Sequence, residues 1–481
     1  MAPQKPSFLA ASLIVVLIVA VLGVTILGYG VAPHIPILIA AVIVGIYGLV
    51  LGYKWKDLEK ALSTGIYHGT PAIIILLLIG TLVGVWVLNG TVQTITYYGL
   101  QILSPTFFLV SAVAITAVVA IAAGSSLSAI STIGIALMGV AYGMGISPAM
   151  TAGAIVSGAI FGDKMSPLSD TTNLAAATAK VDIFQHIKHM MWTTIPSLVI
   201  TMLIFTVIGL STSKDAADIS QVEEMVQILN NEFTISLVTL LSPLLIVILA
   251  MRRINPIPAL IIGLVVAVLT AFYTVPGVTF GDIMNAAHVG YTAETGNEAI
   301  DNLLSLGGLE SMLFGVSLIL ISLSLGGMVS EIGLTHAIID GFKSFLQTRG
   351  NVIMLTVFSC LGINVTVGEQ YLSIILPGQM LEDSYKRANM HPVNLSRTLE
   401  DAGTIIHPII PWGVIGAFIM TTLNIGVEYV PYTFISFITP LIAIIYGYTG
   451  FSLKPLASTG GYSYQDASGT EEEEEKRFYK S

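Results

Sequence analysis

The sequence predicts an all-α polytopic membrane protein, and three observations lead to that prediction. Hydrophobic residues fill 54% of the 481 positions, charged residues fill only 10%, and the mean hydropathy is +0.86. Soluble chains usually carry about 25% charged residues, so this chain lacks the polar surface of a soluble globule. Apolar runs long enough to span a bilayer recur along its length. We therefore expect the lipid bilayer as a partner and no nucleic acid.

Net charge and cysteine content say little about function. Five of the acids behind the formal net charge of -10 form the run Glu471–Glu475. Cys360 is the only cysteine, so no intrachain disulfide can form. The first apolar run, from Phe8 to about Tyr29, continues without a cleavage pattern, so we interpret it as a span and not as a signal peptide.

The apolar runs divide the chain into spans and shorter pieces. Spans are predicted at Phe8–Tyr29, Pro36–Tyr53, Pro71–Leu88, Pro105–Ala123, Met190–Leu210, Phe233–Met251, Pro256–Tyr273, Met312–Met328, Val352–Leu361, Ile409–Leu423 and Tyr432–Tyr448. Amphipathic pieces are expected at Val92–Leu103 and Leu334–Leu346. The Gly- and Ser-rich segment Gly124–Ile146 is expected to be a broken or re-entrant hairpin, and the chain breaks again at Asn364–Pro377.

Lysine and arginine positions predict the orientation, because cytoplasmic loops are enriched in both. With the N-terminus, Lys54–Lys60, Lys180–Lys188, Arg252–Arg253, Lys343–Arg349 and the C-terminal tail inside, 14 of the 19 basic residues are cytoplasmic. Only Lys214 is then clearly outside, in an acidic connector.

The two halves of the chain resemble each other weakly but in the same order. The matched pairs are Ile35-Pro36 with Ile257-Pro258, GTLVGVW (Gly80–Trp86) with GGMVSEI (Gly326–Ile332), and GSSLSA (Gly124–Ala129) with GEQYLS (Gly368–Ser373). The charges give the first spans of the two halves opposite directions, which is typical of inverted repeats in secondary transporters. The alternative is that Pro and Gly recur at the span ends of any polytopic protein.

This pattern predicts four parts. They are a first membrane repeat at 1–210, an extracellular acidic connector at 211–232, a second, inverted membrane repeat at 233–450 and a cytoplasmic disordered tail at 451–481.

The stretch Gly153–Asn173, GAIVSGAIFGDKMSPLSDTTN, is the strongest candidate site. Its polar residues include Asp163, Lys164, Ser166, Ser169, Asp170, Thr171, Thr172 and Asn173. Ionisable residues inside membrane segments are costly and mark functional sites. Pro167 interrupts the helix and frees the carbonyl of Asp163. Oxygens of a broken turn suit a hard cation, and a carboxylate can exchange that cation for a proton.

A purely structural interpretation of the same stretch stays open. Asp163 and Lys164 would then face the headgroup region, and Asp170 would cap a helix that begins near Thr171. Lys164 would pair with either aspartate.

In the second half, Glu369 is the strongest candidate, because apolar sequence surrounds it; a salt bridge to Arg397 is the structural alternative. The accessory candidates are Ser125, Ser126, Lys164, Glu331, Arg397, Glu400, Asp401, Thr404 and His407. His407 is a candidate pH sensor or a satisfied interior histidine. His186 and His189 flank Lys188 and are expected at the surface.

The chain lacks the signatures of ATP-driven and redox proteins. It contains no GxxxxGK[ST] phosphate loop, no Cys/His spacing for a metal and no redox cofactor motif. We therefore expect a transporter that needs no cofactor, and not an enzyme.

Two long motifs resemble the NhaC family of bacterial Na⁺/H⁺ antiporters. They are GAIVSGAIFGDKMSPLSDTTNLAAA, from Gly153, and EDAGTIIHPIIPWG, from Glu400. The resemblance covers about Phe8 to Tyr448. It implies inverted repeats, paired hairpins, elevator-type movement and a homodimer in the bacterial cytoplasmic membrane. By motif match, the ion would bind at Asp163, Ser166, Asp170, Thr171, Thr172 and Asn173, with Na⁺ itself held by Asp163, Asp170 and Asn173.

Two functions follow from this resemblance. The first is export of Na⁺, or Li⁺, in exchange for H⁺. The second is a Na⁺-coupled exchange of organic acids, because the family includes Na⁺-lactate/H⁺-malate exchangers. The scarcity of buried arginine favours the first, since a bound carboxylate needs hydrogen-bond donors.

Overall fold

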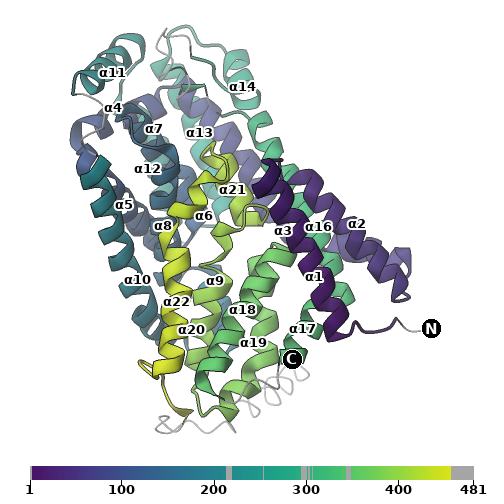
Figure 1. The fold of residues 1–481 in the computed structure, drawn as a ribbon. Coiled ribbons are helices and arrows are strands. Elements are labelled where there is room, and N and C mark those ends of the chain that lie inside the picture. Colours follow the sequence, from purple (N-terminus) through teal and green to yellow (C-terminus); the bar gives the residue numbers. More distant parts are fainter. Residues whose placement is uncertain are drawn as a thin grey trace, which may run out of the picture.

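The computed structural model describes residues 3–212, 219–252, 254–293, 301, 304–305, 307–342 and 348–456. Within these residues the fold is all-helical, with no β-strand (Figure 1). Eight of the described helices are long and apolar enough to cross a membrane, or ten if two bent pairs each count as one span. Large apolar side chains such as Leu203 and Val207 stay exposed, as expected for faces that contact lipid. The predicted all-α polytopic class is confirmed.

The helices have the following bounds. The α-helices are α1 (Phe8–Leu22), α2 (His34–Val50), α3 (Trp55–Leu88), α4 (Thr91–Ile102), α5 (Phe108–Ala123), α6 (Ser126–Ala129), α7 (Ile135–Gly143), α8 (Pro148–Met165), α9 (Asp170–Thr178), α10 (Ile183–Thr212), α11 (Ile219–Glu232), α12 (Leu241–Met251), α13 (Pro256–Thr274), α14 (Phe280–His288), α16 (Leu313–Ile332), α17 (Leu334–Phe342), α18 (Arg349–Val367), α19 (Gln370–Arg387), α20 (Pro392–Gly403), α21 (Val414–Thr422) and α22 (Phe434–Thr449). Short 3₁₀ or π-helical segments are η1 (Gly23–Gly28), η2 (Pro105–Phe107), η3 (Ile130–Gly134), η4 (Leu237–Leu240), η5 (Glu310–Met312), η7 (His407–Ile409) and η8 (Val427–Tyr432).

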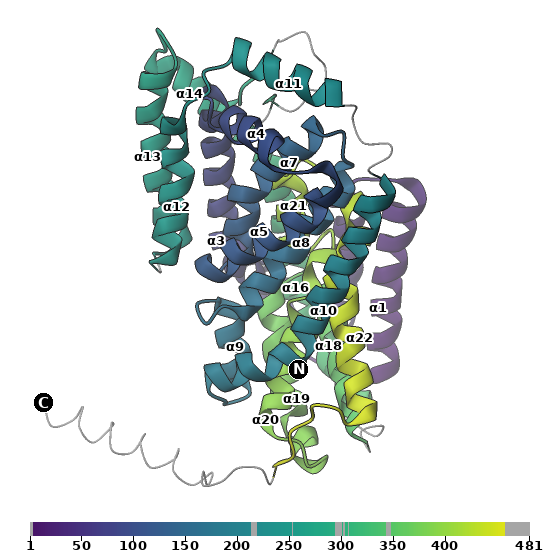
Figure 2. The same cartoon turned by 90° about the vertical axis from the view of Figure 1, so that its left-hand side faces the viewer.

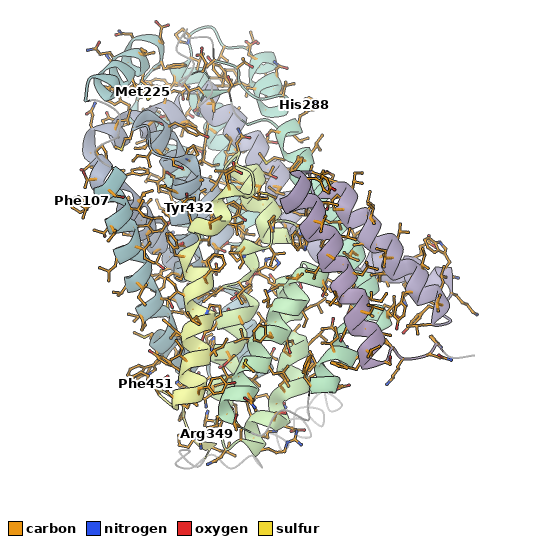
Figure 3. The ribbon with its side chains drawn as sticks, viewed as in Figure 1. Phe107, Met225, His288, Arg349, Tyr432 and Phe451 are labelled. Atoms are coloured by element: carbon orange, nitrogen blue, oxygen red, sulfur yellow. The ribbon has the colours of Figure 1, made fainter. Side chains whose placement is uncertain are left out.

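The bundle has two distinct ends. Helices α4, α11 and α14 gather at one end, and α17, α19 and α20 reach the other (Figure 1). In Figure 3, Met225 and His288 mark the first end, whereas Arg349 and Phe451 mark the second. Figure 2 shows α12 and α13 standing as a pair at one side of the bundle, where α13 packs against α3. Arg349 therefore lies at the end that the basic residues predict to be cytoplasmic.

Two helical hairpins have the same local geometry at their turns. Gly124 ends α5 with φ 66°, and Ser125 then caps α6 by accepting a hydrogen bond from the Ser128 N–H. Gly368 ends α18 with φ 71°, and Glu369 caps α19. A positive φ is strained for residues with a side chain, so glycine suits both turns. The two turns lie 244 positions apart, as the predicted alignment requires. The repeat of 1–210 with 233–450 as a whole stays a prediction.

The hairpins enter the bundle from opposite ends. Helix α5 follows Phe107 in the upper half of Figure 3, and α18 starts at Arg349 at the lower end. The turn of each hairpin therefore points toward the end from which the other hairpin starts. In secondary transporters this arrangement brings broken helices together near the membrane midplane.

Small residues on α8 bring this helix close to α5. A side chain on Gly158 would place its Cβ 2.2 Å from the Val113 carbonyl oxygen, and one on Gly162 would lie 2.2 Å from the Ala117 carbonyl oxygen. Close backbone approach at small residues is the usual packing of membrane helices. It fixes the position of Asp163, the residue that follows Gly162.

Some expected boundaries need correction or lie outside the described residues. The segment Gly124–Ile146 is not a hairpin by itself: after the turn at Gly124 it forms a helical run through α6, η3 and α7, because its glycines and serines are compatible with helix once buried. Of the connector at 211–232, the structure describes 211–212 and helix α11, while 213–218 lie outside. Arg253, Lys214 and the tail from 457 onward also lie outside the described residues.

The chain after α22 binds the start of α20. Asn394 Nδ2 donates to the Lys454 carbonyl oxygen at 2.7 Å, and the Lys454 N–H donates to Asn394 Oδ1 at 3.0 Å. His391 caps α20, since its Nδ1 accepts a hydrogen bond from the Val393 N–H at 3.1 Å. Burial lowers the pKa of His391, and the positive charge of Lys454 lowers it further. The folded protein therefore needs His391 in its neutral form.

This cap predicts a pH-dependent loss of stability. The unfolded chain protonates His391 near pH 6.5, whereas the folded chain resists protonation, so stability is full above that pH and falls as the pH drops below it. His391→Asn keeps a good capping acceptor without a titrating group. We expect the melting temperature in detergent to fall less between pH 7.5 and 5 in this variant than in the wild type. Equal falls would contradict the assignment.

Candidate ion-binding site

The predicted break at Pro167 is present. Helix α8 ends at Met165, and α9 begins at Asp170 after the turn that contains Pro167. The expectation that Asp170 caps α9 is wrong, because the cap is Ser169, whose hydroxyl accepts a hydrogen bond from the Thr172 N–H. Asp170 is the first helical residue, and its exposed carboxylate lies where the helix dipole favours negative charge.

A cavity of about 320 Å³ opens beside this break. Its polar lining comes from the turn after α5, from α6 and η3, from the end of α8, and from the starts of α9, α13 and α19. The polar lining residues are Ser125, Ser126, Ser128, Thr132, Asp163, Ser169, Asp170, Thr171, Asn255, Gln370 and Tyr371. The cavity therefore joins the turns of both hairpins to the α12–α13 pair.

Asp163 is the buried carboxylate of this cavity. Only 8% of the residue is exposed, and Ser126 Oγ donates a hydrogen bond to its Oδ2 at 2.8 Å. The ammonium of Lys164 lies 3.5 Å from the same oxygen. Asp163 thus has one hydroxyl donor and one cation, and it still lines the cavity.

Lys164 lies between two acids from distant parts of the chain. Its Nζ donates to Thr171 Oγ1 at 2.5 Å and lies 3.7 Å from Glu400 Oε2. Both Lys164 and Glu400 are almost fully buried. Thr404 Oγ1 also donates to Glu400 Oε2, whereas Glu400 Oε1 has no hydrogen-bond partner in the described part of the chain. The lysine therefore couples the first half, through Asp163, to α20 in the second half.

A second buried ion pair lies one turn along α20. Arg397 Nε is 4.0 Å from Asp401 Oδ2, and Arg397 Nη1 donates to Ser452 Oγ at 2.8 Å. Thr193 Oγ1 donates to Asp401 Oδ1 at 2.9 Å. The predicted alternative of an Arg397–Glu369 salt bridge is wrong, since Arg397 instead pairs with Asp401 and donates a hydrogen bond to Ser452.

The predicted residues divide into two groups. Those that line the cavity are Asp163, Asp170, Thr171, Ser125 and Ser126. Those that instead hold the turn are Ser166, Thr172 and Asn173: Ser166 Oγ accepts from the Leu168 N–H, Thr172 Oγ1 donates to the Lys164 carbonyl, and Asn173 Nδ2 donates to the carbonyls of Pro167 and Ser169. Asn173 is exposed and lies outside the cavity lining, so the structure does not bring it to the cavity that Asp163 lines.

Glu369 and Glu331 lie elsewhere. Both line a separate cavity of about 250 Å³. Glu369 Oε2 accepts a hydrogen bond from the Leu372 N–H at 2.9 Å, as the cap of α19. The structure therefore does not place Glu369 in the cavity of Asp163.

The histidines also differ from expectation. His407 is fully buried, and neither ring nitrogen has a hydrogen-bond partner within the described ranges, so it is not the satisfied interior histidine of one prediction. His186 and His189 are not surface residues. Ring nitrogens of the two bind Ser396 Oγ at 2.9 Å and Asn394 Oδ1 at 3.1 Å, respectively, on α20.

Sequence reasoning missed three polar residues of the cavity wall. Thr132 lies in the π-helical segment η3, Asn255 precedes α13, and Tyr371 follows the turn of the second hairpin. The Asn-Pro pair at the start of α13 and the Gly before α19 were available as signals of helix starts. The resemblance implied paired hairpins, but nothing in the sequence indicated that the start of α13 also meets the first hairpin.

A polytopic helical bundle that brings buried carboxylates to a polar cavity beside broken helices has the construction of a secondary transporter. Comparison with known proteins agrees with this class. A model of the Na⁺/H⁺ antiporter family matches residues 158–451. The chain belongs to this family.

Three relatives cover most of the chain. The Na⁺/H⁺ antiporter NhaC of Alkalihalophilus pseudofirmus is 43% identical over 88% of this chain and 91% of its own. The NhaC of Bacillus subtilis is 42% identical over 87% of this chain and 92% of its own. A malate-2H⁺/Na⁺-lactate antiporter of Bacillus subtilis is 34% identical over 90% of this chain and 94% of its own.

Removal of the buried Lys164 ammonium should strongly lower the stability of the fold, and removal of the charge on Glu400 should restore part of it. Lys164→Met leaves Asp163 and Glu400 without their cation, and breaking a buried pair costs about 3–5 kcal/mol. We expect a clear fall in the melting temperature, partly restored by adding Glu400→Gln. Lys180→Met is the matched control, because that lysine also pairs with an acid, Glu382, but is 63% exposed. If the two single variants melted alike, the buried pair would not stabilise the fold.

Proposed function

We propose that the protein exchanges cytoplasmic Na⁺ for external H⁺ and that the cavity beside Asp163 is the cation site. The observation that carries the proposal is the placement of the buried Asp163 carboxylate in a cavity ringed by hydroxyl groups. A hard cation that sheds its water needs about six oxygens, including a carboxylate. Asp163, Ser125, Ser126, Thr171 and Asp170 supply side-chain oxygens of this kind.

The lysine gives a physical basis for exchange. Lys164 is a cation already placed 3.5 Å from Asp163. An entering Na⁺ and the ammonium compete for the same carboxylate, and Glu400, 3.7 Å from Nζ, keeps the ammonium paired when Na⁺ is bound. A proton on Asp163 removes the charge that holds Na⁺. Na⁺ and H⁺ then occupy the carboxylate in turn, which is the requirement for antiport.

Alternating access is supported by another cavity, larger than the one beside Asp163. It has a volume of about 760 Å³ and is lined by Tyr142, Val289 and Glu428, near the end of the bundle that bears α14. The run from α6 to α7 lines both cavities, through Thr132 on one side and Tyr142 on the other. We infer that the hairpin-bearing part moves against the helices around α3, the elevator-type movement that the resemblance implies. The homodimer is likewise a proposal, testable by cross-linking in native membranes.

The alternative cargo is a small organic acid. The cavity is large enough for one, and one relative is a malate-2H⁺/Na⁺-lactate antiporter. Against it, the lining carries two aspartates, and the nearby cation Lys164 is already shared by two carboxylates. An anion would therefore meet like charge, which disfavours binding.

The test is Na⁺-driven proton movement in proteoliposomes without organic acid. The wild type should move protons when Na⁺ is added but not when K⁺ is added. Asp163→Asn should abolish the signal, because an amide carries no charge to exchange, whereas Asp170→Asn, at an exposed position, should chiefly raise the KM for Na⁺. Asp383→Asn is the control, because this side chain is 84% exposed and Asp383 does not line the cavity. A signal that appears only with lactate or malate would favour the organic-acid exchanger. Normal exchange by Asp163→Asn would refute the site.

A further inference from the structure

The turn between α18 and α19 separates two cavities. Gln370 and Tyr371 line the cavity of Asp163, whereas Glu369 lines the second cavity, of about 250 Å³. The second cavity lies between α3, α16 and the second hairpin, and the proposed cation exchange does not use it. Consecutive residues of one turn thus face two different spaces.

Glu369 is the buried acid of the second cavity. Only 6% of it is exposed, and no ion pair involves it among the described residues. Its hydrogen-bond donor, the Leu372 N–H, is a backbone group of the first turn of α19 and brings no full charge. A buried carboxylate without a cation is costly, so the site must neutralise it in some other way.

Four other ionisable side chains, from two neighbouring helices, line the same cavity as Glu369. Helix α3 contributes Asp57, Lys60 and His68, and α16 contributes Glu331. Behind the turn, His407 lies against Gly413, which in turn lies close to Gly368. Asp57 and Lys60 belong to the basic loop Lys54–Lys60, which the sequence predicts to be cytoplasmic, so the lining carries ionisable groups from the predicted cytoplasmic side that can pass protons to Glu369.

The cavity suits a proton better than a metal cation. Apart from the ionisable residues, the wall contains two hydroxyl residues, Thr64 and Ser330, and is otherwise apolar or glycine, with Ala61, Gly65, Leu323, Gly327, Val367 and Leu372. Asp57, Thr64, Ser330 and Glu331 add side-chain oxygens to those of Glu369, but Lys60 lines the cavity as well, so a bound metal cation would meet like charge. A proton needs only the carboxylate itself.

We propose that Glu369 is a cytoplasm-side proton-binding site, separate from the cation site, whose charge controls Na⁺ affinity across the turn of the second hairpin. The proposal rests on the proposed exchange of Na⁺ for H⁺. When Glu369 loses its proton, a negative charge appears next to Gln370 and Tyr371, on the wall of the cation cavity. Because that charge is in a low-dielectric region, it attracts Na⁺ from the other side of the turn.

The first hairpin supplies the variant that separates this role from capping. Ser125 caps α6 at the position that corresponds to Glu369. Glu369→Ser therefore keeps a capping hydroxyl and deletes the carboxyl, whereas Glu369→Asp keeps both. Glu382→Ser, on the same helix but outside the cavity, is the control.

The experiment measures the KM for Na⁺ against cytoplasmic-side pH in proteoliposomes. Each linked proton changes the KM by up to about tenfold per pH unit. We expect a shallower pH dependence in Glu369→Ser, and wild-type behaviour in Glu369→Asp and Glu382→Ser. A pH profile of Glu369→Ser that overlays the wild type, in a variant that melts normally, would overturn the proposal.

A second readout does not depend on transport. Dicyclohexylcarbodiimide reacts with protonated, buried carboxyl groups, so mass spectrometry should find it on Glu369 at low pH and progressively less at high pH. Absence of label at every pH would overturn the proton site. If the wild type moved no protons with Na⁺ but Glu369 still titrated in labelling, the proposed exchange would fail and the proton site would stand.

Discussion

The burial of Lys164 between Asp163 and Glu400 is the constraint on which the rest of the structure depends. An uncompensated charge in a dry interior costs several kcal/mol, so the ammonium and both carboxylates must be held within reach of one another. Asp163 precedes Lys164 on α8, but Glu400 comes from α20, more than 200 residues later. The fold must therefore bring α20 against the end of α8, and the glycines that seat α8 on α5 fix one side of that contact.

The same requirement explains the composition of α20. Every residue from Val393 to Gly403 is buried, although the helix carries Arg397, Glu400 and Asp401. The burial of these charged side chains is tolerated because each has a partner: Arg397 pairs with Asp401, and Glu400 pairs with Lys164. The two ion pairs also have different further contacts. Lys164 contacts Asp163, the buried acid of the cavity, whereas Arg397 donates a hydrogen bond to Ser452 in the chain after α22.

Much of the fold was predictable from the sequence, because hydropathy and helix breakers act locally. The spans, the break at Pro167 and the correspondence of Gly124 with Gly368 all follow from short stretches. The partners within the site were less predictable. Asn173 has the right chemistry for a ligand, but its amide holds the turn, and Glu369 turns to the other face of its hairpin. Thr132 and Asn255 reach the cavity only through tertiary packing, which no local pattern records.

The charges around the cavity argue for a cation as cargo. Arg397 and Asp401 cancel, and Lys164 cancels one of its two acids, which leaves Asp163, Asp170 and Glu400 with a net excess of negative charge. One bound Na⁺ reduces that excess by one charge, and one bound proton does the same. The two ions can therefore replace each other without changing the net charge of the site. Na⁺ bound together with a monovalent organic anion leaves the excess unchanged. An exchanger of that kind would need a further donor beside the cavity, and among the described residues the cavity lining includes no lysine or arginine.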